Sequence, residues 1–303
     1  MASEAGGTGG RARGGGRWFG SASSAAVSRV RRRVIAGVAA LALVMLAAAA
    51  HAQRYFREGS FATRYAPAVM PDASFVICRL AYTQVRREQS GIGWETDYPY
   101  AEINLMTRLA ELTKTRISRD QNGDPNFYVI RLTDDQLFNC PIVIASDAGT
   151  IGITAAQAER LRTYLMKGGF LWVDDFWGSA AWDHWASQIA RALPPSEFPI
   201  EDVALDDPML RSMFQIESIP QITNIQFWRQ WGGTYTSERG EDSDQVHLRA
   251  IRDSSRRIMV LMTHNTDVAD SWEREGEDPE FFYQFSPKGY ALGVDVMLHV
   301  MTH

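Results

Sequence analysis

Short apolar runs alternate with amphipathic stretches along most of the chain, which is the pattern of strands alternating with helices. The apolar runs that predict strands cover residues 75–82, 127–132, 141–146, 170–173 and 257–262. Helical spacing of apolar residues predicts helices over residues 101–112, 154–167, 179–192 and 290–300. Strands that alternate with helices form a mostly parallel sheet covered on both faces, so we expect an α/β domain.

The clearest helix boundaries lie on either side of residues 155–167. Thr154 and Gln157 have the spacing of a capping box, and Gly168 with Gly169 ends the helix because glycine adopts the left-handed conformation without a steric cost. In contrast, residues 196–257 have no regular period. We interpret them as an irregular insertion with short helices and a hairpin.

Residues 1–52 have a composition unlike that of the rest. A Gly-, Ser- and Arg-rich stretch ends in Arg31-Arg32-Arg33, an uncharged run covers residues 34–50, and Ala50-His51-Ala52 has the A-x-A form of a cleavage site. This order predicts a secretory signal cleaved before Gln53, or an N-terminal membrane anchor helix if the segment is retained. In both cases we expect the remainder outside the cytoplasm, in the periplasm or tethered to the membrane. Residues 53–73 are interpreted as an extended lead-in and residues 74–303 as the domain.

The net charge of −5 conceals a difference between the leader and the domain. Residues 1–52 carry seven Arg and one Glu, or +6, so the remainder carries −5 minus 6, or −11. An acidic body argues against nucleic-acid binding, which needs basic surface, and suits a cationic ligand or a divalent metal.

Acidic and amide side chains follow three predicted strands at the points where the strands end. In an open α/β sheet, ligands bind at the carboxyl ends of the strands, so these side chains are expected at one shared edge. The segment 94–99 follows the first strand and is interpreted as a rim loop over that edge. The expected ligand-binding residues are Asp97, Asp147, Asp174, Asp175, Trp177, Asn265 and Asp267.

The order and spacing of several segments carry a family resemblance. These segments are Arg79-Leu80-Ala81-Tyr82, Trp94-Glu95-Thr96-Asp97-Tyr98-Pro99, Leu161-Arg162-Thr163-Tyr164-Leu165 with Gly168-Gly169-Phe170-Leu171 and Asp174-Asp175, Asn265-Thr266-Asp267 with Trp272-Glu273, and Leu292-Gly293-Val294. Over about residues 74–302 they resemble the bacterial domain-of-unknown-function family 4159. The resemblance implies a class I glutamine-amidotransferase-like fold, which is a flavodoxin-like three-layer sandwich, and assigns no activity. Relatives are often exported or attached to membrane proteins.

Covalent hydrolase chemistry needs a Cys or Ser on a sharp turn after a strand, activated by a His. The turn that follows residues 170–173 carries no Cys and no G-x-S-x-G pattern, and only Ser179 with His184 remains as a pair. We therefore expect a non-catalytic or catalytically degenerate domain.

A divalent metal is the cofactor that the acids suggest, since Mg²⁺ and Ca²⁺ prefer oxygen ligands. The candidate metal ligands are Asp174, His264, Asp267 and Asp270. For each acid, the alternative is an ordinary helix cap or turn. Sugars also bind to aromatic faces beside acids. On this criterion Trp94, Trp177 and Trp272 stay open, whereas Trp172, Trp182 and Trp185 are assigned to the core.

The two cysteines are expected to be separate buried thiols. Cys78 falls within a predicted strand and Cys140 lies just before another, and neighbouring parallel strands seldom offer disulfide geometry.

Together these features predict an exported domain that binds a polar ligand, either a glycan or a metal, at the cell envelope. One alternative is a hydrolase that depends on a metal or an acid pair. A second alternative is a component of an envelope assembly that acts by contacts with other envelope proteins.

Overall fold

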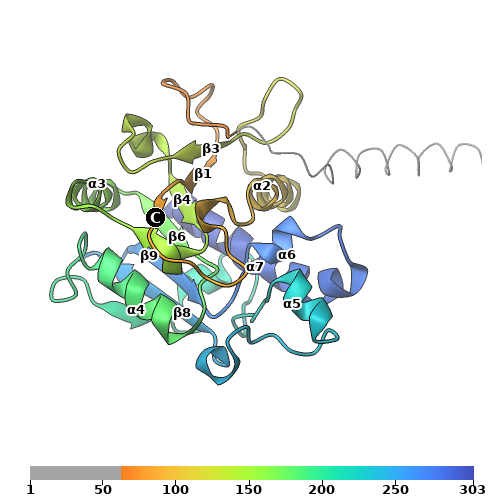
Figure 1. Cartoon of the computed structure of the whole chain (residues 1–303). Coiled ribbons are helices and arrows are strands. Elements are labelled where there is room, and N and C mark those ends of the chain that lie inside the picture. The colour runs from red at the N-terminus through yellow and green to blue at the C-terminus, as the bar shows by residue number, and fades with distance from the viewer. Residues whose placement is uncertain (1–62) are drawn as a thin grey trace, which may run out of the picture. The chain divides into compact units, whose positions relative to one another are not determined.

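The computed structural model describes residues 63–303, and a seven-stranded sheet runs through the middle of this part of the chain (Figure 1). In spatial order the strands are β3 (Phe127–Ile130), β1 (Ile77–Leu80), β4 (Ile142–Ala145), β6 (Phe170–Val173), β9 (Ile258–His264), β8 (His247–Arg252) and β7 (Ile200–Asp202). The first five are parallel, whereas β8 runs antiparallel to β9 and β7 runs antiparallel to β8. The predicted mixed α/β fold with a mostly parallel sheet is confirmed.

Every residue of the five parallel strands is buried, as expected for a sheet that is covered on both faces. Successive side chains of a strand point to opposite faces. Trp172 of β6 therefore packs in one core cluster, while its neighbours Leu171 and Val173 pack in the other.

Helices cover both faces of the sheet (Figure 1). One core cluster contains side chains of α2 (Tyr100–Leu112), α5 (Ile225–Gln230), α6 (Asp270–Glu273) and α7 (Pro279–Thr302). The other contains side chains of α3 (Ala155–Met166) and α4 (Gly178–Ile189). The shorter elements are β2 (Thr83–Gln84), β5 (Ile151–Gly152), η1 (Gly93–Glu95), η2 (Asp135–Asn139), η3 (Ala148–Thr150), η4 (Pro208–Arg211) and η5 (Gly240–Ser243).

Helix boundaries follow the capping residues. The predicted capping box of Thr154 and Gln157 is present at the start of α3. The predicted start of the last helix at residue 290 is wrong, because α7 begins at Pro279, where the Asp278 side chain accepts hydrogen bonds from the first free N–H groups. Pro287 lies inside α7, and an internal proline ordinarily interrupts the helical pattern.

Helices α6 and α7 approach each other closely through two glycines of α7. A Cβ atom on Gly289 would lie 1.9 Å from the Ser271 hydroxyl, and one on Gly293 would lie 2.7 Å from the Trp272 ring. This packing fixes the position of α6, which carries two acids of the site described below.

Cys78 and Cys140 form a disulfide, so the expectation of two separate thiols is wrong. Their Cα atoms are 5.9 Å apart, within the range that a disulfide spans. The argument from parallel strands fails because Cys140 does not belong to a strand. It follows η2 and precedes β4, so its side chain does not have to follow the alternating directions of side chains in a strand. It therefore reaches Cys78 on β1.

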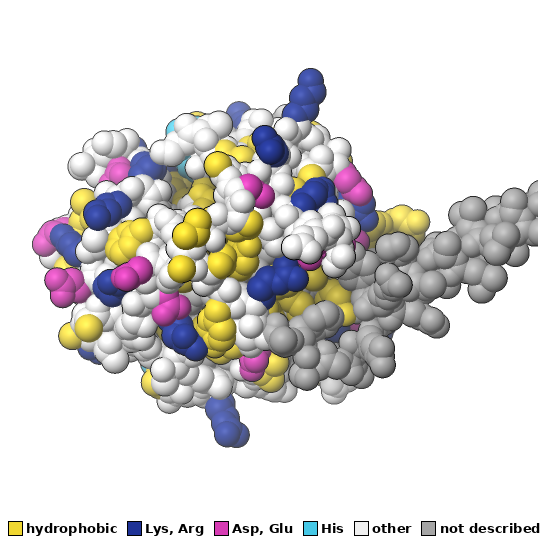
Figure 2. All heavy atoms as spheres, turned by 90° about the horizontal axis from the view of Figure 1, so that it is seen from above, with side chains coloured by type: hydrophobic (Ala, Val, Ile, Leu, Met, Phe, Trp, Pro, Cys, Tyr) yellow, Lys and Arg dark blue, Asp and Glu magenta, His cyan; other side chains and the backbone are white. Residues whose placement is uncertain are grey.

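No helix among residues 63–303 is long and apolar enough to span a membrane. The predicted signal or anchor at residues 1–52 and the first part of the lead-in, residues 53–62, lie outside the described residues, so they stay predictions. On the face seen in Figure 2, basic and acidic side chains are interspersed with apolar ones. That face therefore offers no continuous basic surface of the kind that nucleic acids need.

We expect removal of the disulfide to destabilise the domain. The bond joins residues that are 62 apart in sequence, and in the chain-entropy account a loop of this size contributes about 4 kcal/mol to the free energy of unfolding. Urea unfolding of the Cys78→Ala, Cys140→Ala variant against the oxidised wild type measures this loss. Wild type treated with a thiol reductant is the control and should unfold like the variant; equal midpoints for all three would contradict the expectation.

Candidate functional site

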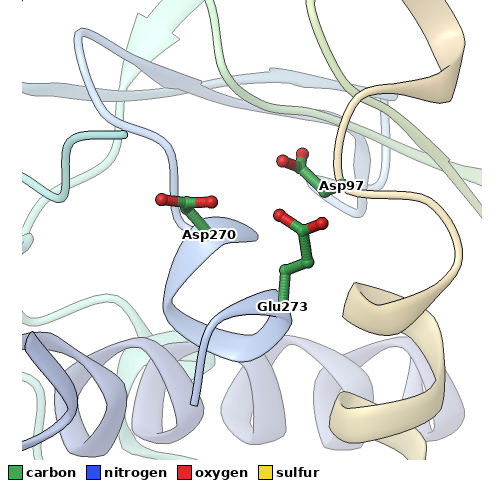
Figure 3. Close-up of side chains that lie close together, drawn as sticks. All are labelled: Asp97, Asp270 and Glu273. Carbon is green, nitrogen blue, oxygen red and sulfur yellow. The ribbon is translucent and has the colours of Figure 1, made fainter. Parts of the chain in front are cut away.

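Five carboxylates from three segments of the chain converge at the carboxyl end of the sheet, and we call them the acid cluster. They are arranged in two groups that share Asp97. The ligand oxygens of Asp97, Asp175 and Asp267 lie within 4.8 Å of one another, and so do those of Asp97, Asp270 and Glu273. Figure 3 shows the second group, with Asp270 and Glu273 on α6 facing Asp97 from the loop before α2.

The backbone turns sharply at several of the strand-end residues. Asp97, Asp147, Asp175 and Asn265 all have positive φ angles, of 65°, 50°, 53° and 62°. Asp and Asn tolerate this left-handed region better than other residues with a Cβ. After β6 the chain takes this left-handed turn at Asp175, so Asp175 no longer follows the alternation of strand side chains. Of the adjacent acids Asp174 and Asp175, only Asp175 joins the acid cluster.

Asp97 is held from behind by a buried polar network. The Ser146 hydroxyl donates to Asp97 Oδ2 at 2.7 Å, and Arg79 donates to the Ser146 hydroxyl and to the Thr96 carbonyl. Arg79 lies on β1, is fully buried and forms an ion pair with Glu102 of α2. The position of Asp97 thus depends on three elements, β1, α2 and the turn after β4.

The α6 side of the cluster is fixed by backbone donors and one arginine. The Ile225 N–H donates to Asp270 Oδ2 at 2.8 Å, and the Asp270 N–H donates to Asp267 Oδ1 at 2.9 Å. Arg274 Nε lies 2.8 Å from Glu273 Oε2 and 3.4 Å from Asp270 Oδ1. Arg274 is 36% exposed, so this side of the cluster is the one that borders solvent.

Burial raises the pKa of every acid in the cluster, and neighbouring carboxylates raise it further at Asp175, Asp267, Asp270 and Glu273. The pKa of Asp270 rises to about 7 and that of Glu273 to about 9, while those of Asp175 and Asp267 rise well above their usual range. Arg79 and the Ser146 hydroxyl partly offset this rise at Asp97. The acids therefore cannot all carry their charge at neutral pH unless an additional positive charge is present.

Other predicted residues lie beside the cluster and hold the structure together. Asp174 accepts hydrogen bonds from the Thr263 hydroxyl and, at 2.8 Å, from the Ala269 N–H, and burial raises its pKa to about 7. His264 faces the Gly178 carbonyl at 3.1 Å through Nε2. Neither residue belongs to the two groups of converging oxygens.

Asn265 and Asp147 also bind backbone. Asn265 Oδ1 accepts from the Gly178 N–H at 2.8 Å, and Asp147 Oδ2 accepts from the Gly93 N–H at 2.8 Å. A Cβ on Gly91 would lie 2.4 Å from Asp147 Oδ2, so the loop before η1 covers this carboxylate. Burial raises the Asp147 pKa to about 7.

The Trp177 side chain is only 4% exposed, and its indole N–H donates to Asp175 Oδ1 at 3.0 Å. This contact makes Trp177 a residue that positions Asp175, and its ring face is not open to solvent. Trp272 is 2% exposed and packs edge to face on Trp172.

Ser179 and His184 do not form a catalytic pair. Ser179 donates to Asp242 through both its N–H and its hydroxyl, whereas His184 Nε2 lies 2.7 Å from the Ile151 carbonyl. The two side chains thus engage different partners.

Sequence reasoning missed Glu273 and Arg274 as site residues. A signal for Glu273 was present, because Asp267, Asp270 and Glu273 recur every third residue, and residues three apart share one side of a helical turn. Arg79, Glu102 and Ser146 carried no such signal. Their role depends on contacts between distant segments.

The family model described as Domain of unknown function (DUF4159) matches residues 77–301. The match covers most of the chain, which therefore belongs to this family. No curated protein matches the chain.

The raised pKa values make the stability of the cation-free protein depend on pH. Between about pH 4, near the ordinary carboxyl pKa, and pH 7 to 9, the folded cluster binds more protons than the unfolded chain, so stability falls as pH rises. We expect thermal melts in chelator to show a melting temperature that declines from pH 5 to pH 9. An Asp270→Asn variant should decline less steeply, while Glu197→Gln, which alters an exposed acid, should follow wild type. A wild-type profile that rises over this range would contradict the expectation.

Proposed function

We propose that this member of the family is an exported domain whose acid cluster binds a divalent metal cation. The observation that carries the proposal is the convergence of five acids from three segments of the chain into two groups of oxygens, each within 4.8 Å. Mg²⁺, Mn²⁺ and Ca²⁺ are the cations that take ligand sets made only of oxygen.

The hydrogen bonds of the cluster support a cation as the missing partner. Asp267 is 2% exposed, yet among residues 63–303 no donor reaches its Oδ2 atom. Asp97 is 6% exposed and its Oδ1 atom likewise has no donor in this part of the chain. Charged side chains of buried residues are ordinarily paired or coordinate a metal.

The topology supports a flavodoxin-like fold, which the glutamine-amidotransferase-like group shares. Numbered along the chain, the parallel strands have the spatial order 2-1-3-4-5, which is the flavodoxin-like order. In such sheets ligands bind outside the carboxyl ends of the strands near the point where the order reverses. Here that point lies between β1 and β4, and Asp97 and Ser146 follow these strands.

The disulfide supports a location outside the cytoplasm. Disulfides persist in oxidising compartments such as the periplasm and are rare in the cytosol. The Cys78–Cys140 bond therefore agrees with the signal or anchor predicted at residues 1–52.

A glycan is less well supported than a cation as the ligand. Two of the tryptophans that stayed open for sugar binding, Trp177 and Trp272, are buried, so neither offers a ring face to a sugar. The unpaired oxygens of Asp97 and Asp267, by contrast, suit a cation.

Cation binding is testable by calorimetry and thermal shift on protein stripped with a chelator. We expect Mg²⁺, Mn²⁺ or Ca²⁺ to raise the melting temperature at pH 8, because a ligand at a hundredfold its Kd adds about 2.7 kcal/mol to the free energy of unfolding. Asp267→Asn keeps the side-chain size and should abolish the response, whereas Glu197→Gln should retain it. If none of the three cations gives binding heat or a thermal shift with wild type, the proposal fails.

A further inference from the structure

We infer that the acid cluster holds two divalent cations side by side, with Asp97 as the carboxylate that bridges them. This inference rests on the proposed function and adds to it the number of cations and the role of Asp97. It starts from the geometry, in which Asp97 is the only acid common to both groups of converging oxygens among the described residues.

Each group supplies three protein oxygens to one cation. Asp175 and Asp267 stand on one side of Asp97, and Asp270 and Glu273 stand on the other. Water completes the shell of such cations when the protein offers few ligands. A carboxylate has two oxygens with several lone pairs, so Asp97 has enough acceptor capacity to serve both sides.

A carboxylate oxygen without a donor points to a ligand on the Asp175 side that is separate from Arg274. Of the five acids of the cluster, Arg274 pairs with Glu273 and Asp270, and outside the cluster it also pairs with Glu277. Asp267 belongs to the other group and is 2% exposed as a residue, and its Oδ2 atom has no donor or ion-pair partner within residues 63–303. A single cation on the Glu273 side would leave the Asp267 carboxylate without a positive partner, although a charged side chain in a nearly buried residue ordinarily has one.

The balance of charge favours two cations over one. The cluster has five carboxylates and a single paired arginine, Arg274. With all five ionised, one divalent cation leaves two negative charges without compensation, and two divalent cations leave none. Two metal ions that share a carboxylate at about 3.5–4 Å are a recurrent arrangement in proteins.

The two positions differ in access, which predicts unequal affinities. Asp267 is buried, whereas Glu273 is partly exposed and already bound by Arg274. A cation on the Glu273 side has to compete with that guanidinium. We therefore expect the Asp175 side to bind first and the Glu273 side to bind more weakly.

The test is a count of cations per chain with Mn²⁺ as the probe. Chelator-stripped protein at pH 8 is dialysed against Mn²⁺, and bound metal is measured by elemental analysis and electron paramagnetic resonance. We expect two Mn²⁺ per chain with the spectrum of a spin-coupled pair. Glu273→Gln should leave one Mn²⁺ with the six-line spectrum of an isolated ion, and Asp97→Asn should remove the coupling. Glu277→Gln also loses an acid that pairs with Arg274, but it is not a member of either group, so it should keep two coupled ions.

The wild-type count decides the inference without relying on any variant. One uncoupled Mn²⁺ per chain at saturation overturns the paired site and leaves the proposed function standing. No bound Mn²⁺, Mg²⁺ or Ca²⁺ overturns both. Circular dichroism of each variant in chelator checks that it folds before its metal count is interpreted.

Discussion

Mutual repulsion of buried carboxylates is the constraint on which the structure around the acid cluster depends. Like charges a few ångströms apart destabilise one another most where water cannot screen them. The surrounding chain holds them together despite this, with the buried Arg79–Glu102 pair behind Asp97 and the Ile225 N–H on Asp270. Helix α7 packs tightly against α6 through Gly289 and fixes the base of the cluster. Holding these acids close together lowers the free energy of unfolding of the domain. Such a destabilising arrangement is typical of functional sites rather than of structural ones.

The same constraint explains why neighbouring residues have different roles. Asp174 and Asp175 are adjacent, and both have raised pKa values because of burial. Asp174 receives two donors and links the end of β6 to β9 and to the start of α6. Asp175 has a left-handed backbone conformation and, among residues 63–303, accepts a hydrogen bond only from the Trp177 indole N–H. The carboxylate with more donors stabilises the fold, and the one with fewer donors belongs to the acid cluster of the proposed cation site.

The alternation of apolar runs was enough to predict the parallel strands, because buried strands need continuous apolar sequence. Polar residues at the ends of parallel strands lie at one edge of the sheet, and this rule correctly predicted from the sequence that Asp175 and Asp267 lie close together. The rule could not separate Asp174 from Asp175, since that difference lies in a single φ angle. Nor could it find Arg79 or the Cys78–Cys140 bond, which depend on contacts between segments far apart in sequence.

Protons and cations compete to neutralise the negative charge of the acid cluster. At low pH the cluster is neutral because its acids are protonated, and a cation would have to displace those protons before it could bind. As pH rises, ionisation becomes the costly step, because Asp270 and Glu273 reach their pKa values only near 7 and 9. Cation affinity should therefore increase with pH, and each binding event should release protons. Arg274 also neutralises part of this negative charge, but it supplies a single positive charge at one side of the cluster. A proton neutralises one carboxylate, and Arg274 pairs with two acids of the cluster. A divalent cation contacts several carboxylates at once, so it fits the converging arrangement of these acids best.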